Sequence, residues 1–336
     1  MAIRVAINGF GRIGRTIFKA AIDRKAPLEI VAINDLSAPS ELAYLLKYDS
    51  VHGVWPHDVS GSENELTVGG KTYKCVKVKD PAQSPWHELK VDVVLESTGR
   101  FADRDGCQKH INAGARKVIV TAPGKGMDAT FVMGVNDSSY DPRAHHIVSN
   151  ASCTTNCLAP IVSLLHDRFV IEHGLMTTIH SYTMDQRILD SLHKDKRRAR
   201  AAALSMIPTT TGAARAVAEV IPELKGKLDG LAIRVPTPNV SLVDLVCTLG
   251  QDVTKDQVNK VFEEAANGPL KGILQCVTEE LVSIDFNHTA LSSSVDMALT
   301  NVIGGRMVKV FSWYDNEYGY SNRVVDLAMM MERDLD

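Results

Sequence analysis

A glycine-rich turn close to the start of the chain constrains the fold more than any other feature of the sequence. The β-branched run Ile3–Asn8 predicts a buried strand, and Gly9-Phe10-Gly11-Arg12-Ile13-Gly14 follows it directly. A helix is expected over residues 15 to about 24, which places a G-x-G-x-x-G pattern between a strand and a helix. In this context the pattern is typical of a dinucleotide-binding βαβ unit.

The three glycines and a later acid have distinct expected roles. Gly9 permits the tight turn, Gly11 lets the backbone approach a pyrophosphate, and Gly14 lets the helix pack on the strand. The helix start then offers free N–H groups to phosphates. A second expected strand, Leu28–Asn34, ends at Asp35, 21 residues after Gly14. A carboxylate there suits the ribose hydroxyls of NAD and repels the extra phosphate of NADP.

Further strand-like runs indicate a parallel α/β sheet. They cover residues 91–96, 117–121 and 146–149, and helical or loop segments separate them. Residues 54–86 are rich in turns, and the alternating run 65–74 predicts an inserted hairpin. Two polar segments follow strands at the edge where ligands bind, although turns alone would also explain them: Ser97-Thr98-Gly99 and Thr121-Ala122-Pro123.

Composition and charge argue against several classes of protein. Hydrophobic residues make up 45% and charged residues 23% of the 336 residues, as in ordinary globular proteins, and the net charge of −3 does not favour nucleic acid or an anionic membrane. We find no apolar run of about 18 residues that would cross a membrane, and no signal peptide. The six cysteines form neither a disulfide framework nor a zinc pattern, so we expect no metal site and a cytoplasmic location.

The segment around Cys153 is the most informative part of the second half. Ser149-Asn150-Ala151-Ser152-Cys153-Thr154-Thr155-Asn156-Cys157 follows a strand and opens a helical stretch that reaches about residue 168. The N–H groups at a helix start favour a thiolate, so we expect a lowered pKa for Cys153. A small buried cysteine is the alternative, and it is the expected role of Cys157 inside the helix.

A nucleophilic cysteine needs a base, and His180 is one candidate. The alternating run 174–180 predicts a strand that ends at His180, where a side chain can project into a site. The sequence has 11 histidines, however, so spacing alone does not select this one.

Several motifs, in one order along nearly the whole chain, resemble the glyceraldehyde-3-phosphate dehydrogenase family. They are the glycine turn, the Cys153 segment, Leu46-Lys47-Tyr48-Asp49-Ser50, Ser97-Thr98-Gly99, Pro208-Thr209-Thr210-Thr211-Gly212-Ala213-Ala214, Arg234-Val235-Pro236-Thr237-Pro238 and Trp313-Tyr314-Asp315-Asn316-Glu317-Tyr318-Gly319-Tyr320-Ser321. The resemblance implies an enzyme that oxidises glyceraldehyde 3-phosphate with NAD and inorganic phosphate. It also implies a homotetramer.

The resemblance implies a thioester mechanism. Cys153 would attack the aldehyde, and His180 would activate the thiol and accept the hydroxyl proton while hydride passes to the nicotinamide. Phosphate would then attack the Cys153 thioester and release an acyl phosphate.

The resemblance also implies sites for two anions and for the cofactor. Thr183 and Arg234 would hold the substrate phosphate, and Ser152, Thr154, Arg198, Thr211 and Gly212 would serve the attacking phosphate. For the cofactor, the implied residues are Gly9, Gly11, Arg12, Ile13, Gly14, Asp35, Lys79, Thr121 and Asn316. The alternatives are a solvated basic run around Arg198 and a turn asparagine at Asn316.

Two departures from the family pattern and two other functions remain open. Asp190 is followed by Ser191-Leu192 instead of a pair that ends in proline, so NADP acceptance is not excluded, and Met184 stands where asparagine is common.

An erythrose-4-phosphate dehydrogenase would share the cysteine chemistry but hydrolyse its thioester. A catalytically idle redox-sensing or binding protein on the same scaffold would use the oxidisable thiol alone.

We therefore expect two domains. The first is a Rossmann-like NAD-binding domain over residues 1–152, completed by a carboxy-terminal helix over 318–336. The second, over 153–317, is an α+β catalytic domain with a mostly antiparallel sheet. Its expected strands include residues 230–234, 241–248 and 307–313.

Overall fold

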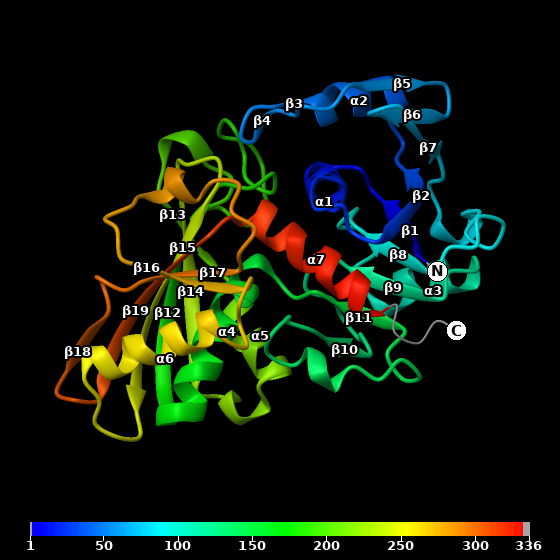
Figure 1. Cartoon of the computed structure of the whole chain (residues 1–336). Helices are drawn as coiled ribbons and strands as arrows, with labels where there is room; N and C mark the ends of the chain where they lie inside the picture. Colours follow the sequence, from blue (N-terminus) through cyan, green and yellow to red (C-terminus); the bar gives the residue numbers. More distant parts are fainter. Residues whose placement is uncertain (1, 332–336) are drawn as a thin grey trace. The chain divides into compact units, whose positions relative to one another are not determined.

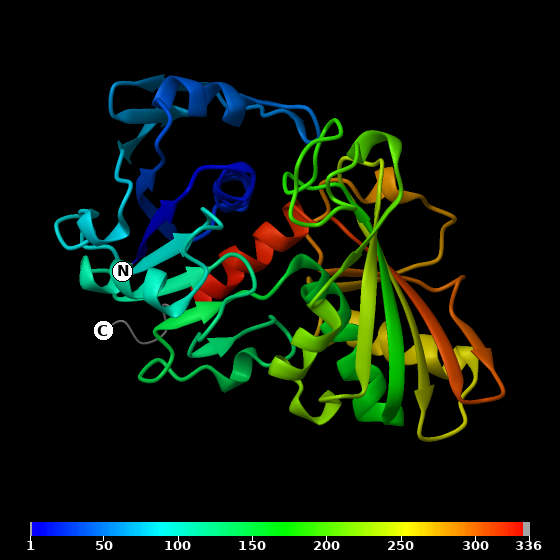
Figure 2. The same cartoon turned by 180° about the vertical axis from the view of Figure 1, so that it is seen from behind.

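The computed structural model describes residues 2–331, which form two compact units. The first unit comprises residues 2–131, 139–151 and 321–331, and the second comprises 132–138 and 152–320. Figures 1 and 2 draw the chain from two opposite sides.

A single sheet of nine strands forms the centre of the first unit. Its strand order is β10-β11-β9-β8-β1-β2-β7-β6-β5, and the pairs from β10 to β7 are parallel. The strands are β1 Ile3–Asn8, β2 Leu28–Asn34, β5 Val59–Ser62, β6 Glu65–Val68, β7 Lys71–Val76, β8 Val93–Glu96, β9 Lys117–Val120, β10 Ala129–Thr130 and β11 Ile147–Ser149; β3 Tyr48–Asp49 and β4 Gly53–Val54 form a separate pair. The expected Rossmann-like sheet is confirmed.

The strand β1 lies between β2 and β8, and this position determines where a ligand can bind. The chain passes from β1 to β2 on one side and later returns to β8 on the other side. The register pairs Asn8 with Asn34 and with Glu96, so the carboxyl ends of all three strands are level. Such a reversal of strand order opens a crevice at that edge of a parallel sheet.

Four helices belong wholly or partly to the first unit: α1 Arg12–Asp23, α2 Pro39–Lys47, α3 Arg104–Asn112 and α7 Tyr318–Met330. The first begins earlier than residue 15, because the backbone leaves the extended conformation directly after Gly11. The last ends before the described residues do, and residues 332–336 of the expected carboxy-terminal helix lie outside them.

The predicted insert is a three-stranded antiparallel meander that extends the sheet. Gly69 and Gly70, both with positive φ, make the turn between β6 and β7. Because β7 also pairs in parallel with β2, the insert continues the central sheet instead of standing apart from it. One buried cluster of the core includes the indole of Trp86, which is fully buried.

The second unit is a mixed sheet with helices along it. The order is β13-β14-β12-β15-β19-β17-β16, with β18 on β19; only β12–β14 and β16–β17 are parallel pairs. Its elements are α4 Cys153–Phe169, β12 Ile171–Ser181, β13 Ile207–Thr210, α5 Ala213–Val220, β14 Leu228–Val235, β15 Ser241–Leu249, α6 Lys255–Asn267, β16 Leu274–Val277, β17 Ser293–Asp296, β18 Asn301–Ile303 and β19 Met307–Tyr314. The expected mostly antiparallel sheet is confirmed.

Alternation along the strands explains why one face of this sheet is covered. Residues of β15 alternate between buried and half-buried along its whole length, as expected for a strand with one face in a core. The helix α4 contacts β12, β15, β17 and β19, and α5 and α6 flank it (Figure 1). From behind, β12 and β14 run side by side (Figure 2).

The units differ from the expected domain limits mainly at residues 132–138, which belong to the second unit although they precede residue 152. Close packing explains this assignment. A Cβ atom at Gly134 would lie 2.7 Å from side-chain atoms of Leu270 and Ile273. Only a glycine lets the segment approach them so closely.

We predict that serine substitution destabilises the fold at one glycine of the turn and leaves its stability almost unchanged at another. A Cβ at Gly14 would lie 2.1 Å from the carbonyl oxygen of Gly9, whereas a Cβ at Gly11 would meet no atom within 4 Å. Gly14→Ser should lower the free energy of unfolding of the ligand-free protein by about 1–3 kcal/mol. Gly11→Ser should change it by less than about 0.5 kcal/mol.

Urea unfolding followed by circular dichroism measures both variants against the original chain. Equal losses of stability in the two variants would contradict the expected close approach of Gly14 to Gly9.

Candidate active site

The crevice at the carboxyl ends of β1, β2 and β8 contains a pocket within the first unit. Three of its sides come from the residues that follow these strands, and the fourth comes from the end of the insert. The lining residues are Asn8, Gly9, Gly11, Asn34, Asp35, Leu36, Val78, Lys79, Ser97, Thr98, Arg100 and Phe101. The sequence indicated this edge through Ser97-Thr98-Gly99, but it did not identify Arg100 or Phe101, whose only signal was their place after β8.

The glycines have the geometry that their expected roles require. Gly9 has a φ of +92°, and a Cβ on it would lie 2.8 Å from the backbone nitrogen of Thr98. Gly11 is exposed and precedes the first residue of α1, where no side chain caps the helix. A helix start beside the pocket favours the binding of an anion there.

The side chain of Arg12 pairs with Asp49, and Arg12 does not line the pocket. Its guanidinium binds both carboxylate oxygens of Asp49, at 3.1 and 3.3 Å. Burial tends to raise the pKa of Asp49, but the backbone N–H groups of His52 and Val51, together with Arg12, lower it to about 2. Ile13 lies in the first turn of α1 and is half-buried.

The other expected cofactor residues of this unit have different environments. Both oxygens of Asp35 accept backbone N–H groups, from Phe10 at 2.8 Å and from Ser37 at 2.9 Å, which holds the carboxylate at the pocket. Lys79 is exposed and lines the pocket. Thr121 does not belong to the lining; it is buried, and its Oγ1 lies 3.1 Å from the carbonyl oxygen of Glu96.

Cys153 is the first residue of α4 in the second unit. The hydroxyl of Ser152 caps this helix by accepting the N–H of Thr155 at 3.0 Å. The Sγ atom of Cys153 lies 3.5 Å from Nε2 of His180. Cys157, one turn later, is fully buried against Ser312, and burial raises the pKa of its thiol to about 12, which suits a structural role.

The register between two parallel strands places Arg234 beside His180. The two residues are paired between β12 and β14, and Nη1 of Arg234 lies 2.7 Å from Nδ1 of His180. Nδ1 also lies 2.7 Å from the carbonyl oxygen of Ser181, which accepts from Nη1 at 3.1 Å. Because a guanidinium can only donate, the contact of Nη1 with Nδ1 needs the lone pair of Nδ1 and places the imidazole proton on Nε2. If Arg234 turned to another partner, Nδ1 could carry the proton and donate it to Ser181, which would leave the lone pair of Nε2 facing the sulfur, as a base requires.

Burial keeps this cysteine and histidine in their neutral forms. It lowers the pKa of His180 to about 3, with the nearby charge of Arg234 as the second cause. Burial also raises the pKa of the Cys153 thiol, against the opposing effects of Arg234 and of Thr154. The expectation of a lowered thiol pKa was therefore wrong for the ligand-free chain, because desolvation outweighs the helix start.

Tyr314 supports the site, although it was not selected from the sequence. Its hydroxyl lies 2.8 Å from Oγ1 of Thr154 and 2.9 Å from Oγ1 of Thr178, and its ring lies nearly perpendicular to the imidazole of His180. The only sequence signal was its place in a family motif. The hydroxyl of Thr154 is thus buried and engaged.

Arg198 is held by two carboxylates and is not part of a freely solvated run. It pairs with Asp185 and lies 3.5 Å from Asp195, and its Nη2 reaches Oγ1 of Thr209 at 3.4 Å. Thr183 is tied to the same loop, because its N–H donates to Oε1 of Gln186 at 3.1 Å.

The starts of α4 and α5 lie next to each other. Oγ1 of Thr155 lies 3.4 Å from the carbonyl oxygen of Ala213, the first residue of α5. Gly212 precedes this helix, and Oγ1 of Thr211 accepts the N–H of Ala213 at 3.1 Å. Two helix starts therefore converge near Cys153, which favours anion binding there.

Asn316 is nearly buried, and its side chain has a fixed direction. Its Oδ1 accepts the hydroxyl of Ser241 at 2.8 Å, and Oγ of Ser241 accepts the N–H of Ser181. The amide nitrogen of Asn316 is consequently the group that can face a ligand.

Within residues 2–331, no helix is both long and apolar enough to cross a membrane. The same residues contain no group of three His, Cys, Asp or Glu side chains arranged to hold a metal ion.

Family models match both parts of the chain. The model described as the NAD-binding domain of glyceraldehyde 3-phosphate dehydrogenase matches residues 3–104, and the model of its C-terminal domain matches residues 152–316.

Curated relatives match over almost the full length of both sequences. Glyceraldehyde-3-phosphate dehydrogenase of Geobacillus stearothermophilus is 60% identical over 98% of each chain. Two further relatives bear the same name. Glyceraldehyde-3-phosphate dehydrogenase 1 of Bacillus subtilis is 58% identical over 98% of each chain, and the relative from Streptomyces coelicolor is 54% identical over 100% of each chain. The chain therefore belongs to the glyceraldehyde-3-phosphate dehydrogenase family.

Proposed function

We propose that the chain catalyses the NAD-dependent oxidation and phosphorylation of D-glyceraldehyde 3-phosphate to 1,3-bisphosphoglycerate, a reversible step of sugar breakdown and synthesis. The observation that carries the proposal is the contact between Cys153 and His180, 3.5 Å apart at the start of α4. The family and the names of the relatives indicate the substrate.

The neutral pair can start the reaction by proton transfer. Nε2 of His180 takes the thiol proton as Sγ of Cys153 bonds to the aldehyde carbon, and the same proton passes to the new alkoxide, which gives a thiohemiacetal. His180 then takes the hydroxyl proton back as the same carbon loses a hydride and becomes the carbonyl of a Cys153 thioester. Attack by inorganic phosphate on this thioester breaks the C–S bond, whose electron pair stays on Sγ, and releases the acyl phosphate. The proton on His180 then returns to Sγ.

The first unit fits a bound dinucleotide. Gly9 and Gly11 leave room for a pyrophosphate at the uncapped start of α1, and Asp35 is held at the pocket. When bound, NAD accepts the hydride that the thiohemiacetal loses. Lys79, Thr121 and Asn316 remain predicted cofactor residues; of the three, only Lys79 lines this pocket.

Two anion sites are part of the proposal. Arg234 and Thr183 would hold the phosphate of the substrate, and a phosphate on Arg234 would free Nδ1 of His180 to donate to Ser181. Arg198, with the backbone at Thr211 and Gly212, would hold the attacking phosphate. Ser152 and Thr154 would contribute through backbone groups, since both hydroxyls have partners within the protein.

The proposal also covers the choice between NAD and NADP, the location of the protein in the cell and its oligomeric state. Asp35 supports NAD over NADP, while Ser191-Leu192 after Asp190 leaves NADP as a slower alternative. A cytoplasmic homotetramer stays a prediction. Phosphorylation is favoured over the hydrolysis of an erythrose-4-phosphate dehydrogenase because two helix starts converge near Cys153, and the Cys153–His180 pair argues against an idle redox sensor.

Turnover assays test the reaction directly. With glyceraldehyde 3-phosphate and NAD, the absorbance of reduced cofactor should rise continuously only when inorganic phosphate is present. Sustained turnover without phosphate would replace the proposal with the hydrolytic enzyme. Absence of turnover in folded, reduced protein would leave the redox-sensing function.

We predict that His180→Gln lowers kcat by about 10²–10⁴-fold, because a general base contributes on that order.

The variant His180→Gln should also lose part of the acid sensitivity of the fold. In the original chain, His180 is neutral when folded down to about pH 3, whereas unfolded histidine gains its proton near pH 6.5. Stability is therefore full above pH 6.5 and falls as the pH drops toward 3.

Steady-state kinetics and the pH dependence of the urea midpoint measure these two effects. A midpoint in the variant that falls with acid as steeply as in the original chain would contradict the buried neutral imidazole.

We predict that Asp35→Asn narrows the preference for NAD. The amide keeps an acceptor for a backbone N–H but removes the charge that repels the NADP phosphate. The ratio of kcat/KM for NAD to that for NADP should fall by about ten-fold. An unchanged ratio would assign the preference to residues outside this pocket.

A further inference from the structure

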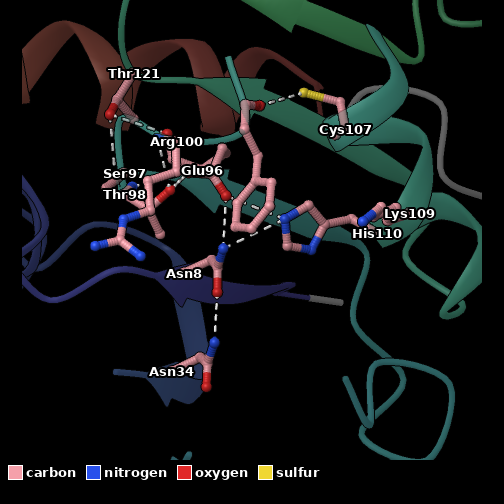
Figure 3. A network of polar contacts seen from close by, with 12 residues as sticks. Asn8, Asn34, Glu96, Ser97, Thr98, Arg100, Cys107, Lys109, His110 and Thr121 are labelled. Carbon is pink, nitrogen blue, oxygen red and sulfur yellow. Dashed lines mark hydrogen bonds and ion pairs between the residues drawn. The ribbon is translucent and has the colours of Figure 1, made fainter. Parts of the chain in front are cut away.

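A buried carboxylate beneath the dinucleotide pocket takes no part in the proposed chemistry. Glu96 is the last residue of β8 and is 2% exposed. Its oxygens receive four donors: Nδ2 of Asn8 at 2.6 Å, Nε2 of His110 at 3.1 Å, the N–H of Thr98 at 2.8 Å and the hydroxyl of Thr98 (Figure 3). Three of these four donors belong to Asn8 and Thr98, which line the pocket.

One end of this network is directed by Trp86. The indole N–H of Trp86 donates to Nδ1 of His110 at 2.9 Å, and an indole N–H can only donate. Nδ1 of His110 must therefore accept, so the imidazole carries its proton on Nε2 and donates to Glu96. Both residues are fully buried, which leaves no water to reverse this direction.

The other end is directed by the backbone of Val78. The amide of Asn34 accepts the N–H of Val78 at 2.8 Å and donates to its carbonyl oxygen at 2.9 Å. This fixes the orientation of Asn34, which also donates to Oδ1 of Asn8 at 2.6 Å. Asn8 must then turn its Nδ2 group toward Glu96.

The directions from both ends converge on Glu96, which can only accept. Thr98 adds a third constraint, because its Oγ1 accepts the N–H of Arg100 at 3.0 Å and so turns its proton toward the carboxylate. Four donors and no acceptor around a buried group require an ionised carboxylate, since an amide or a carboxylic acid would place a donor against a donor.

We propose that the Glu96 carboxylate is a positioning residue for the dinucleotide, because it ties together three sides of the pocket. It holds Thr98 and Asn8 directly, and Asn8 in turn holds Asn34 (Figure 3). Through Asn34 it also reaches Val78, which lines the pocket next to Lys79. The inference rests on the proposed use of this pocket for NAD. It adds a residue that sets the shape of the pocket without touching the cofactor.

The variant Glu96→Gln tests the role of the acceptor at nearly constant size. Its amide NH₂ group must face either the N–H of Thr98 or the donors of Asn8 and His110, so the pocket wall must move. The equilibrium Kd for NAD, measured by calorimetry, should rise by about ten-fold. The KM for NAD should rise with it, while kcat at saturating NAD stays within about two-fold, because the catalytic groups lie in the other unit.

The chain offers a matched control in Asp128→Asn. Asp128 is a carboxylate of the same unit that accepts from Arg104 and from the N–H groups of His146 and Ile147, none of which lines the pocket. This variant should lose stability but retain the original Kd for NAD. An equal loss of affinity in the control would reduce the role of Glu96 to general stability and overturn the proposal.

A reciprocal exchange provides the second test. Asn8→Asp alone would set two carboxylates against each other at the 2.6 Å contact. In the double variant with Glu96→Gln, the carboxylate stands at position 8 and the amide at position 96. This carboxylate can accept hydrogen bonds from the amide at position 96, from Asn34 and from Nε2 of His110, which lies 3.4 Å from Nδ2 of Asn8 in the original chain. The double variant should bind NAD more tightly than either single variant.

The outcomes separate this inference from the function itself. A wild-type Kd in Glu96→Gln, or a double variant that binds no better than the single variants or does not fold, would overturn the positioning role. Calorimetry needs no turnover, so NAD binding tests the network even if the proposed reaction fails. Failure of the original chain to bind NAD would instead overturn both.

Discussion

The parallel pairing of β1 between β2 and β8 is the constraint on which the first unit depends. It brings Asn8, Asn34 and Glu96 to one level, although they are far apart in the sequence. The positive φ of Gly9 and the close approach of Gly14 then turn the chain into α1 without covering the strand ends. The pocket exists because these backbones approach one another more closely than side chains would permit.

A second strand register has a comparable role in the catalytic unit. The pairing of β12 with β14 places Arg234 beside His180, and the start of α4 brings Cys153 to the other side of the imidazole. The same burial that holds these groups also keeps the thiol and the imidazole neutral without ligands. Ligand binding is therefore the step that can change their charges, since it changes both solvation and the partners of Arg234.

In both units, the direction of each hydrogen bond, meaning which atom donates and which accepts, matters as much as its length. Trp86 and the backbone of Val78 determine which atoms donate to Glu96, and Ser241 determines which end of the Asn316 amide remains for a ligand. Trp86, Val78 and Ser241, which set these directions, lie outside the motifs that identify the family. They were not selected from the sequence because tryptophan, valine and serine are ordinary core or turn residues until their neighbours are known.

The sequence by itself determined the glycine turn, β1, β2, the acid at Asp35, the helix that starts at Cys153 and the family, because these depend on local periodicity and on residues adjacent in the chain. It did not determine the contact of Arg234 with His180, the engagement of Arg12 by Asp49 and of Thr154 by Tyr314, or the raised pKa of Cys153. Only the tertiary structure decided these, because each depends on desolvation and on hydrogen bonds between segments that the sheet register brings together.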